Sequence, residues 1–171
     1  MCCKFDICKI LSTIIFIFLI LILIVCMNCS NTEDKSILTA VATTGDNTDL
    51  GNAIIKFSKN NIVEGTAISH QEGTSEFNIN ETGIYQISYQ LYGVNNAKGT
   101  FNFNAIILKN GATINETLSS SPVLTDDINN RMTLTSTVIL SLNAGDIVQL
   151  GGLSLEETEY TNALIDIVKI K

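Results

Sequence analysis

Apolar and polar residues alternate along three segments of this chain, and this pattern restricts the fold more than any other feature. The segments are residues 83–93, 101–108 and 131–142. Their apolar positions are Tyr85, Ile87, Tyr89, Leu91, Phe101, Phe103, Ala105, Ile107, Met132, Leu134, Val138, Leu140 and Leu142. A period of two places these side chains on one face of a β-strand and the polar side chains on the other. The pattern therefore predicts three half-buried strands.

Turn residues and shorter apolar runs extend this prediction along the chain. Further strand candidates are at residues 52–58, 62–69 and 76–79. Asn110-Gly111 is typical of a two-residue hairpin turn, and it would join the strand ending at Leu108 to residues 112–117. Residues 162–170 are apolar on both faces apart from Asp166, which is typical of a central strand. We expect an all-β fold over residues 52–171, an antiparallel sandwich or jelly roll of about eight strands.

A run of 18 uncharged residues at positions 10–27 predicts a transmembrane helix. As a helix it would be about 27 Å long, close to the ~30 Å hydrocarbon core of a bilayer. Lys4 and Lys9 precede the run and acidic residues 33 and 34 follow it, a charge distribution that favours a cytoplasmic N-terminus. We therefore expect a short cytoplasmic segment at residues 1–9, a single-pass anchor at residues 10–27 and an extracellular C-terminal domain.

Two alternatives to a retained anchor stay open. The segment could be a cleaved signal peptide, although its apolar run is long and no Ala-x-Ala-like site follows it. The chain could also be a lipoprotein modified at Cys26 or Cys29, although Val25 and Asn28 precede these cysteines where lipidation needs a small residue. All three interpretations export the C-terminal domain.

The cysteines and the linker separate the N-terminal segment from the rest of the chain. All five cysteines lie within the first 29 residues, so the predicted domain contains no disulfide of its own. Residues 28–51 are polar and show no helical period, which predicts a stalk with one short strand near Ile37–Ala42. They contain no Gly-x-y repeat, so the stalk is not collagen-like.

Charge excludes one class of partner. The net charge is −7, and no basic stripe with interleaved aromatic residues occurs. Nucleic acid repels such a surface, so we expect no nucleic-acid binding.

Two motifs resemble the core of the complement component 1q and tumour necrosis factor superfamily. The segment Phe77–Tyr89, FNINETGIYQISY, is similar to its F-x-(V/I)-x-x-x-G-x-Y-x-(F/I)-x-(Y/F) pattern. The segment Leu140–Leu150, LSLNAGDIVQL, is similar to its L-x-L-x-x-G-D-x-V-x-L strand pair. The resemblance covers residues 52–171 and implies a ten-stranded jelly roll that forms a homotrimer around a three-fold axis.

Within this superfamily, the chain is closest in character to the C-terminal domain of collagen-like exosporium glycoproteins of spore-forming bacteria. Those proteins carry a collagen stalk where this chain has an apolar segment. The resemblance therefore leaves two locations open, the spore surface and the cell envelope.

Candidate site residues are few, and none points to catalysis. His70 is the only histidine, and no serine-hydrolase, phosphate-loop or zinc-protease motif is present. Some complement-like relatives bind calcium near the trimer apex, and this resemblance makes Asp126 and Asp127, in the 118–130 loop, the candidate metal ligands. Solvated loop charge is the alternative for both. Beyond this calcium candidate, the sequence indicates no cofactor.

Other residues are candidates for interfaces. Ile84, Ile106, Leu108 and Ile139 are apolar at positions that the alternation assigns to the outer faces of strands, and a trimer interface would explain them. Tyr92 could belong to a ligand face, whereas Tyr85 and Tyr89 have the pattern of core residues.

Together these features predict a surface-displayed, trimeric structural or adhesive module without catalytic activity, whose ligand is a surface molecule, protein or glycan that the sequence leaves unidentified. The alternative is a monomeric carbohydrate-binding jelly roll, exported as a lipoprotein or secreted protein. The lack of tryptophan disfavours this alternative, because sugar sites commonly use an exposed aromatic platform.

Overall fold

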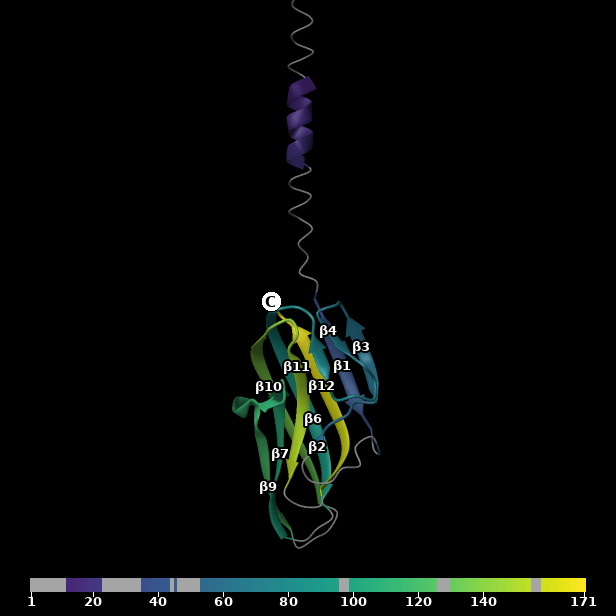
Figure 1. Cartoon of the computed structure of the whole chain (residues 1–171), viewed down its shortest axis with the longest axis vertical. Coiled ribbons are helices and arrows are strands. Elements are labelled where there is room, and N and C mark those ends of the chain that lie inside the picture. The colour runs from purple at the N-terminus through teal and green to yellow at the C-terminus, as the bar shows by residue number, and fades with distance from the viewer. Residues whose placement is uncertain are drawn as a thin grey trace, which may run out of the picture. The chain divides into compact units, whose positions relative to one another are not determined.

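The computed structural model describes residues 12–22, 35–43, 45, 53–95, 99–125, 130–154 and 158–171. The chain divides into two units, Met1–Asp34 and Lys35–Lys171 (Figure 1). In the first unit, residues 12–22 are helical and the apolar side chains from Ile14 to Ile22 are exposed. Among the described residues, no helix is both long and apolar enough to cross a membrane. The remainder of the predicted anchor at 10–27, and the segment 1–9, lie outside the described residues.

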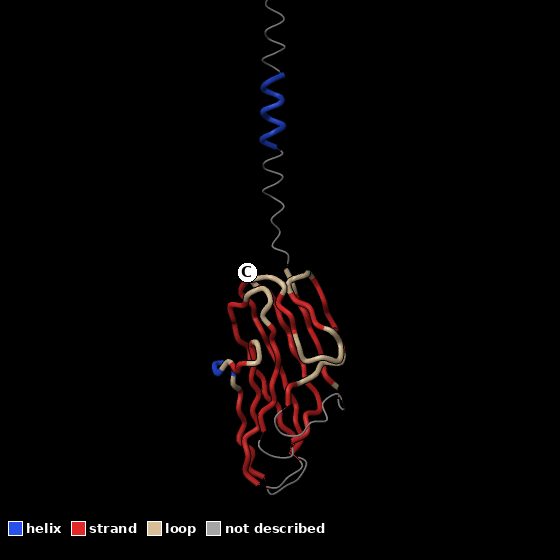
Figure 2. The backbone as a smooth tube through the Cα atoms, viewed as in Figure 1, coloured by secondary structure: helices blue, strands red, loops and turns tan. Residues whose placement is uncertain are grey.

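The second unit consists almost entirely of antiparallel strands (Figure 2). These are β1 (Ile37–Ala42), β2 (Ala53–Ile54), β3 (Lys59–Glu64), β4 (Ile68–His70), β5 (Phe77–Ile79), β6 (Gly83–Asn95), β7 (Gly99–Lys109), β8 (Ala112–Thr113), β9 (Ser119–Thr125), β10 (Asn130–Leu142), β11 (Ile147–Ser154) and β12 (Thr158–Lys169), with one 3-10 turn, η1 (Asn115–Thr117). They form a five-stranded sheet in the order β10-β6-β12-β1-β3 and a seven-stranded sheet in the order β4-β5-β11-β7-β8, to which β2 and β9 add at β11 and β7. The predicted antiparallel sandwich is confirmed, but the described residues form twelve strands, where the alternation indicated about eight and the resemblance implied ten.

The three alternating segments correspond to the long strands β6, β7 and β10, which extend a few residues beyond the predicted ends. The last strand, β12, lies between β6 and β1, as its two apolar faces predicted. The Asn110-Gly111 turn joins β7 to β8, with φ of 53° and 78° at its two residues. Positive φ at both positions is the requirement that selects Asn-Gly in such a turn.

The β1 strand differs from the expected stalk. Its residues pair with β12 on one side and β3 on the other, and Leu38, Ala40 and Ala42 are buried in the core. The folded domain therefore begins at Lys35 rather than at residue 52. The segment ILTAVA is short and lies between polar stretches, so its role depends on pairing with strands far along the chain, which local sequence does not reveal.

The predicted strand at 62–69 is also different, because a turn divides it. Gly65 has φ of 74° and separates β3, on the edge of the five-stranded sheet, from β4, on the edge of the other. Positive φ at a glycine is compatible with a reversal there and incompatible with a continuous strand.

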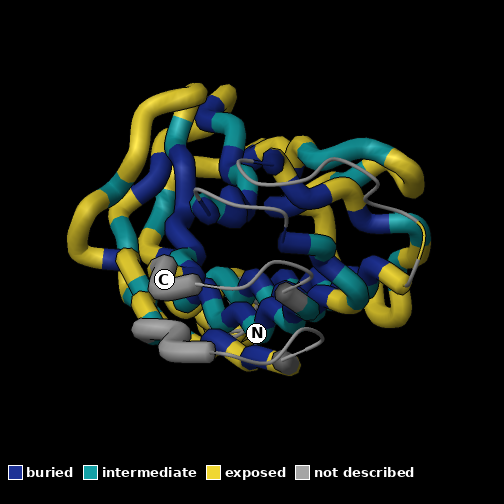
Figure 3. Tube along the Cα trace, turned by 90° about the horizontal axis from the view of Figure 1, so that it is seen from below, coloured by how far each residue is buried: buried dark blue, intermediate teal, exposed yellow. Residues whose placement is uncertain are grey.

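The core fills the space between the two sheets, and buried positions of both layers face one another in Figure 3. Tyr85 and Tyr89 point into this core, as their spacing indicated. The Tyr89 hydroxyl lies 3.1 Å and 2.8 Å from the carbonyl oxygens of Ala105 and Thr117. A buried hydroxyl without such a partner would destabilise the fold, so Tyr89 also fixes the β7–η1 region.

Candidate functional site

The outer face of the five-stranded sheet carries exposed apolar side chains at one end. Ile84 on β6 is 37% exposed, Ile139 on β10 is 60% exposed and Ile170, just after β12, is 44% exposed. Ile170 and Ile84 are held together by a hydrogen bond from the Ile170 N–H to the Ile84 carbonyl, 2.8 Å long. We call these three residues the isoleucine cluster. It lies at the same end of the domain as Lys171.

The four predicted interface residues do not share one surface. Ile84 and Ile139 belong to the five-stranded sheet, whereas Ile106 and Leu108 belong to β7 of the other sheet. Ile106 and Leu108 are only 3% and 9% exposed within one chain. Of the predicted set, therefore, Ile84 and Ile139 are the residues with substantial apolar surface left for a partner.

Ile106 and Leu108 lie outside the core cluster, as the alternation predicted, but both are buried within one chain. A Cβ atom added to Gly152 would meet the Tyr160 ring of the opposite sheet, so Gly152 faces inward and Gly151 faces outward. Ile106 pairs with Gly151, and a Cβ on Gly151 would lie 2.8 Å from Leu108 Cδ1. The bare glycine backbone leaves room for these two side chains to lie flat on the sheet.

The candidate metal ligands Asp126 and Asp127 lie outside the described residues. Across the part of the chain that the structure describes, no three histidine, cysteine, aspartate or glutamate side chains come together as a metal site. The calcium site therefore stays a prediction.

His70 has a structural environment, formed by contacts with neighbouring strands and a turn. It ends β4, and its ring stacks on Phe77 with centroids 4.3 Å apart. Its Nε2 lies 3.1 Å from the Thr74 carbonyl and its Nδ1 2.7 Å from the Asn60 side-chain oxygen. Burial lowers the pKa of His70, while the Thr74 hydrogen bond and the charge of Glu72 oppose this shift. These contacts link β3 to the turn after β4.

Asp146 is the centre of a second polar cluster, in the turn between β10 and β11. Its carboxylate lies 2.8 Å from Lys109 Nζ, and it accepts hydrogen bonds from the Asn143 N–H and the Asn110 side chain. These contacts, with that of Lys109 first, lower the pKa of Asp146 to about 2. The Gly-Asp pair of the motif therefore joins the β10–β11 turn to the β7–β8 hairpin.

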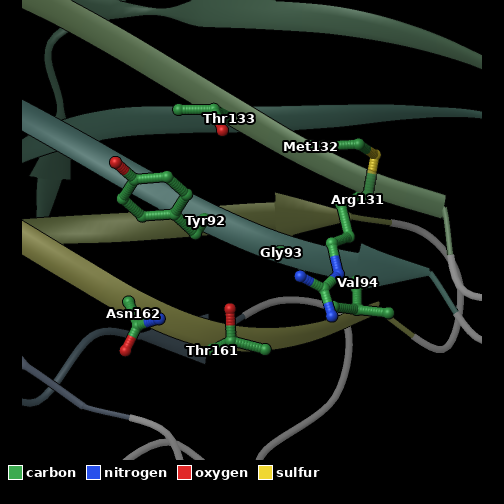
Figure 4. Close-up of a pocket in the computed structure, with 8 residues that line it drawn as sticks. All are labelled: Tyr92, Gly93, Val94, Arg131, Met132, Thr133, Thr161 and Asn162. Carbon is green, nitrogen blue, oxygen red and sulfur yellow. The ribbon is translucent and has the colours of Figure 1, made fainter.

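A pocket of mixed polarity lies at the other end of the five-stranded sheet, on its outer face. Its volume is about 580 Å³. Among the described residues, eight line it: Tyr92, Gly93, Val94, Arg131, Met132, Thr133, Thr161 and Asn162 (Figure 4). Of these, sequence reasoning singled out only Tyr92, because the lining residues come from three strands that are far apart in sequence.

No family model matches the sequence, and no curated protein matches it either. Solved structures do match. The structure of murine APRIL at pH 8.0 has a TM-score of 0.57 and 15% identity, covering 80% of this chain and 99% of that chain. The globular domain of zebrafish complement 1qA has a TM-score of 0.54 and 10% identity, covering 80% of this chain and 98% of that chain. The described domain has the jelly-roll fold of the tumour necrosis factor and complement component 1q superfamily.

Proposed function

We propose that this protein is a homotrimeric, non-catalytic binding module that an N-terminal anchor displays outside the cell. The observation that carries the proposal is the isoleucine cluster, Ile84, Ile139 and Ile170, exposed on the face of a regular sheet. On the solvent-facing side of an antiparallel sheet, residues at such positions are normally polar. Contact with neighbouring copies would remove this apolar surface from water, with a gain of roughly 25 cal/mol for each Å² buried.

The strand register supports one continuous contact surface around this cluster. Ile139 lies opposite Gln86, Gln86 lies opposite Val168, and Val168 lies opposite Ile37. Three of these four adjacent strands thus present an outward apolar side chain in this row, and β6 presents Gln86, two residues from Ile84 of the cluster. A self-associating surface of this kind fits a closed, symmetric oligomer, and the likeness of the fold to complement and tumour necrosis factor domains favours three copies.

The setting of His70 supports a non-catalytic role. Its ring is stacked on Phe77, and both of its nitrogens face protein oxygens in the β3–β4 region. A general base needs a free nitrogen directed at a substrate. We therefore assign His70 to the stability of the sandwich edge.

Display by a membrane anchor rests on the N-terminal segment. Its described part is a helix whose apolar side chains are exposed all round, and the uncharged run continues on both sides of it in the sequence. A helix that is apolar on every face is typical of a lipid environment. The charge distribution favours an extracellular C-terminal domain.

The mass of the full-length protein in detergent, measured by light scattering and corrected for bound detergent, tests the trimer. We expect three chains per particle at micromolar concentration and dissociation of the Ile139→Asp variant. Val63→Asp is the matched control, because Val63 is 56% exposed but lies on the edge strand β3 opposite the core residue Leu38, and so on the other face of the sheet from the cluster. A monomeric wild-type protein, or equal dissociation of both variants, would contradict the proposed interface.

A further inference from the structure

The turn between β7 and β8 carries a reactive pair of residues as well as a structural one. Asn110-Gly111 is the only Asn-Gly dipeptide in the chain, and both of its residues are exposed. In such a dipeptide the backbone nitrogen of the glycine can attack the side-chain carbonyl carbon of the asparagine, since glycine has no Cβ to hinder the approach. The turn is therefore a place where the protein can modify itself without an enzyme.

The reaction is deamidation, and water is its only co-reactant. The Gly111 nitrogen loses its proton and bonds to Cγ of Asn110, the Cγ–Nδ2 bond breaks, and the side-chain nitrogen takes up a proton and leaves as ammonia. Water then opens the resulting cyclic imide at either of its carbonyl carbons. The product at position 110 is an aspartate or an isoaspartate, in which the main chain runs through the former side-chain carbonyl.

In the folded domain, contacts with the β10–β11 turn hold both polar atoms of the Asn110 side chain. Its Nδ2 donates to Asp146 Oδ1 over 2.8 Å, and its Oδ1 accepts from the Ile147 N–H over 2.8 Å. The Asn110 backbone N–H also donates to the Ile147 carbonyl over 2.8 Å. Ring closure makes Cγ tetrahedral and expels Nδ2, so it breaks the contact with Asp146. The rate of deamidation therefore depends on how often this contact opens.

The charge of Asp146 makes the change irreversible for the fold. Lys109 and two amide donors lower the pKa of Asp146 to about 2, so its carboxylate is ionised at neutral pH. This carboxylate faces the NH2 group of an intact Asn110. In the aspartate product a carboxylate oxygen replaces that nitrogen, and two like charges at this distance repel each other. The original contact cannot form again, so deamidation permanently loosens the β7–β8 and β10–β11 turns.

We propose that Asn110 is a self-modification site and that the carboxylate of Asp146 restrains its deamidation. Each opening of the contact exposes the turn to conversion, so the converted fraction records how long this end of the domain has been open. The site belongs to the seven-stranded sheet, whereas the isoleucine cluster lies on the five-stranded sheet. Deamidation at Asn110 therefore does not depend on the proposed trimer.

Incubation of the full-length protein in detergent at mildly alkaline pH tests the proposal. Mass spectrometry of the peptide that contains Asn110, together with enzymatic methylation of isoaspartate, measures the conversion. We expect the folded wild type to convert at least about tenfold more slowly than the same protein in urea, and Asp146→Ala to accelerate conversion of the folded protein by about tenfold or more, the effect of one charged hydrogen bond on an opening equilibrium.

Gly152→Ala is the matched control for lost stability, because it crowds the Tyr160 ring in the core and leaves the Asp146 contacts in place. If Asp146→Ala converted no faster than Gly152→Ala, general unfolding would explain the rate and the proposed restraint would be wrong. Equal rates for the folded and the unfolded wild type would also overturn it, and so would an unfolded chain that formed neither product at position 110.

The Asn110→Asp variant tests the consequence separately, because it is the direct mimic of one product. We expect its melting temperature to lie below that of the wild type measured in parallel, since the new carboxylate faces Asp146. An unchanged melting temperature would contradict the permanent loosening of the two turns.

Discussion

Asp146 shows how one residue of a short motif stabilises two turns that are distant in sequence. Asn110 donates to its Oδ1 over 2.8 Å, and the Asn143 N–H donates to its Oδ2 over 2.7 Å. Asn110 in turn accepts a hydrogen bond from the Ile147 N–H. The left-handed φ of Asn110 thus positions a side chain that serves both its own hairpin and the next turn. The aspartate of the LSLNAGD segment has a structural role in this protein.

We predict that Asp146→Asn lowers the free energy of unfolding at neutral pH by about 1–3 kcal/mol, because it weakens a charged hydrogen-bonding cluster. The pKa of Asp146 is lowered from 3.8 to about 2 by Lys109 and the two amide donors. The ionised carboxylate therefore contributes its full stabilisation at pH values above the pKa of the unfolded state, 3.8. This stabilisation is lost as the pH falls towards the pKa of the folded state, about 2.

Urea denaturation at several pH values measures this effect. The difference between wild type and Asp146→Asn should shrink as the pH falls between those two values. Glu116→Gln, at an exposed position in η1, makes the same charge change and is the control. If the difference in the free energy of unfolding stayed constant down to a pH near the folded-state pKa, the ionised carboxylate would not be responsible for it.

At such single positions, sequence reasoning reached only part of the answer. The local chemistry of the sequence indicates only a turn at residues 143–146, where Asn and Gly are favoured. It did not predict the contact of Asp146 with Asn110, since that contact depends on the pairing of β7 with β11.

Strand β11 contains two consecutive glycines that face opposite sides of one sheet. Gly152 faces the core, where an added Cβ would contact the Tyr160 ring. Gly151 faces outward, where an added Cβ would lie 2.8 Å from Leu108 Cδ1, the end of a flexible side chain. Tyr160, which belongs to the five-stranded sheet, also stacks on Phe103 of the seven-stranded sheet, with ring centroids 5.8 Å apart. The inward glycine therefore admits a tightly packed aromatic pair.

We predict that Gly152→Ala destabilises the domain by about 1–3 kcal/mol, the usual effect of adding a carbon to a well-packed core. Gly151→Ala should cost less than half as much, because the Leu108 side chain can move. Both variants make the same chemical change in the same strand, so thermal or urea unfolding compares them directly. Equal effects would mean that strand propensity, and not packing against Tyr160, determines the cost.

The long strands could be predicted because their own residues record which face is buried. β6 alternates from Tyr85 to Leu91, and β10 alternates from Met132 to Leu142 with Ser136 as the exception on its inward face. The short strands could not be predicted as well. β1 was assigned to a stalk, and β3 and β4 were merged, because their boundaries are set by partners elsewhere in the chain and by the positive φ of Gly65. Local alternation is a weak signal in segments of six residues or fewer.

The candidate pocket was beyond sequence reasoning for a related reason. Tyr92, Arg131 and Asn162 come together because β6 lies between β10 and β12. The sequence predicted each of these three strands, but it did not predict their order in the sheet. The four candidate interface residues failed to form one surface for the same reason, since alternation identifies an outward face without identifying the sheet.

Retention of the N-terminal segment is the prediction that separates the anchor from its alternatives. We expect the full-length chain to remain in membranes washed with carbonate, with the C-terminal domain open to protease from outside. A soluble product that begins near residues 28–32 would instead identify a cleaved signal peptide. Labelling of Cys26 or Cys29 with a radioactive fatty acid, together with loss of the preceding residues, would identify a lipoprotein.

The stability of the whole assembly should depend on protein concentration. The domain has no cysteine to form a disulfide, so its stability must come from the core between the sheets and, under the proposed function, from contacts between copies. Association that accompanies folding raises the melting temperature as concentration increases. We expect this rise for the wild type and its loss in Ile139→Asp, measured by calorimetry over a hundredfold range of concentration. A chelator should leave the melting temperature nearly unchanged. If melting were independent of concentration and a chelator lowered it by many degrees, a bound cation, with Asp126 and Asp127 as its candidate ligands, would be stabilising the domain in place of the subunit interface.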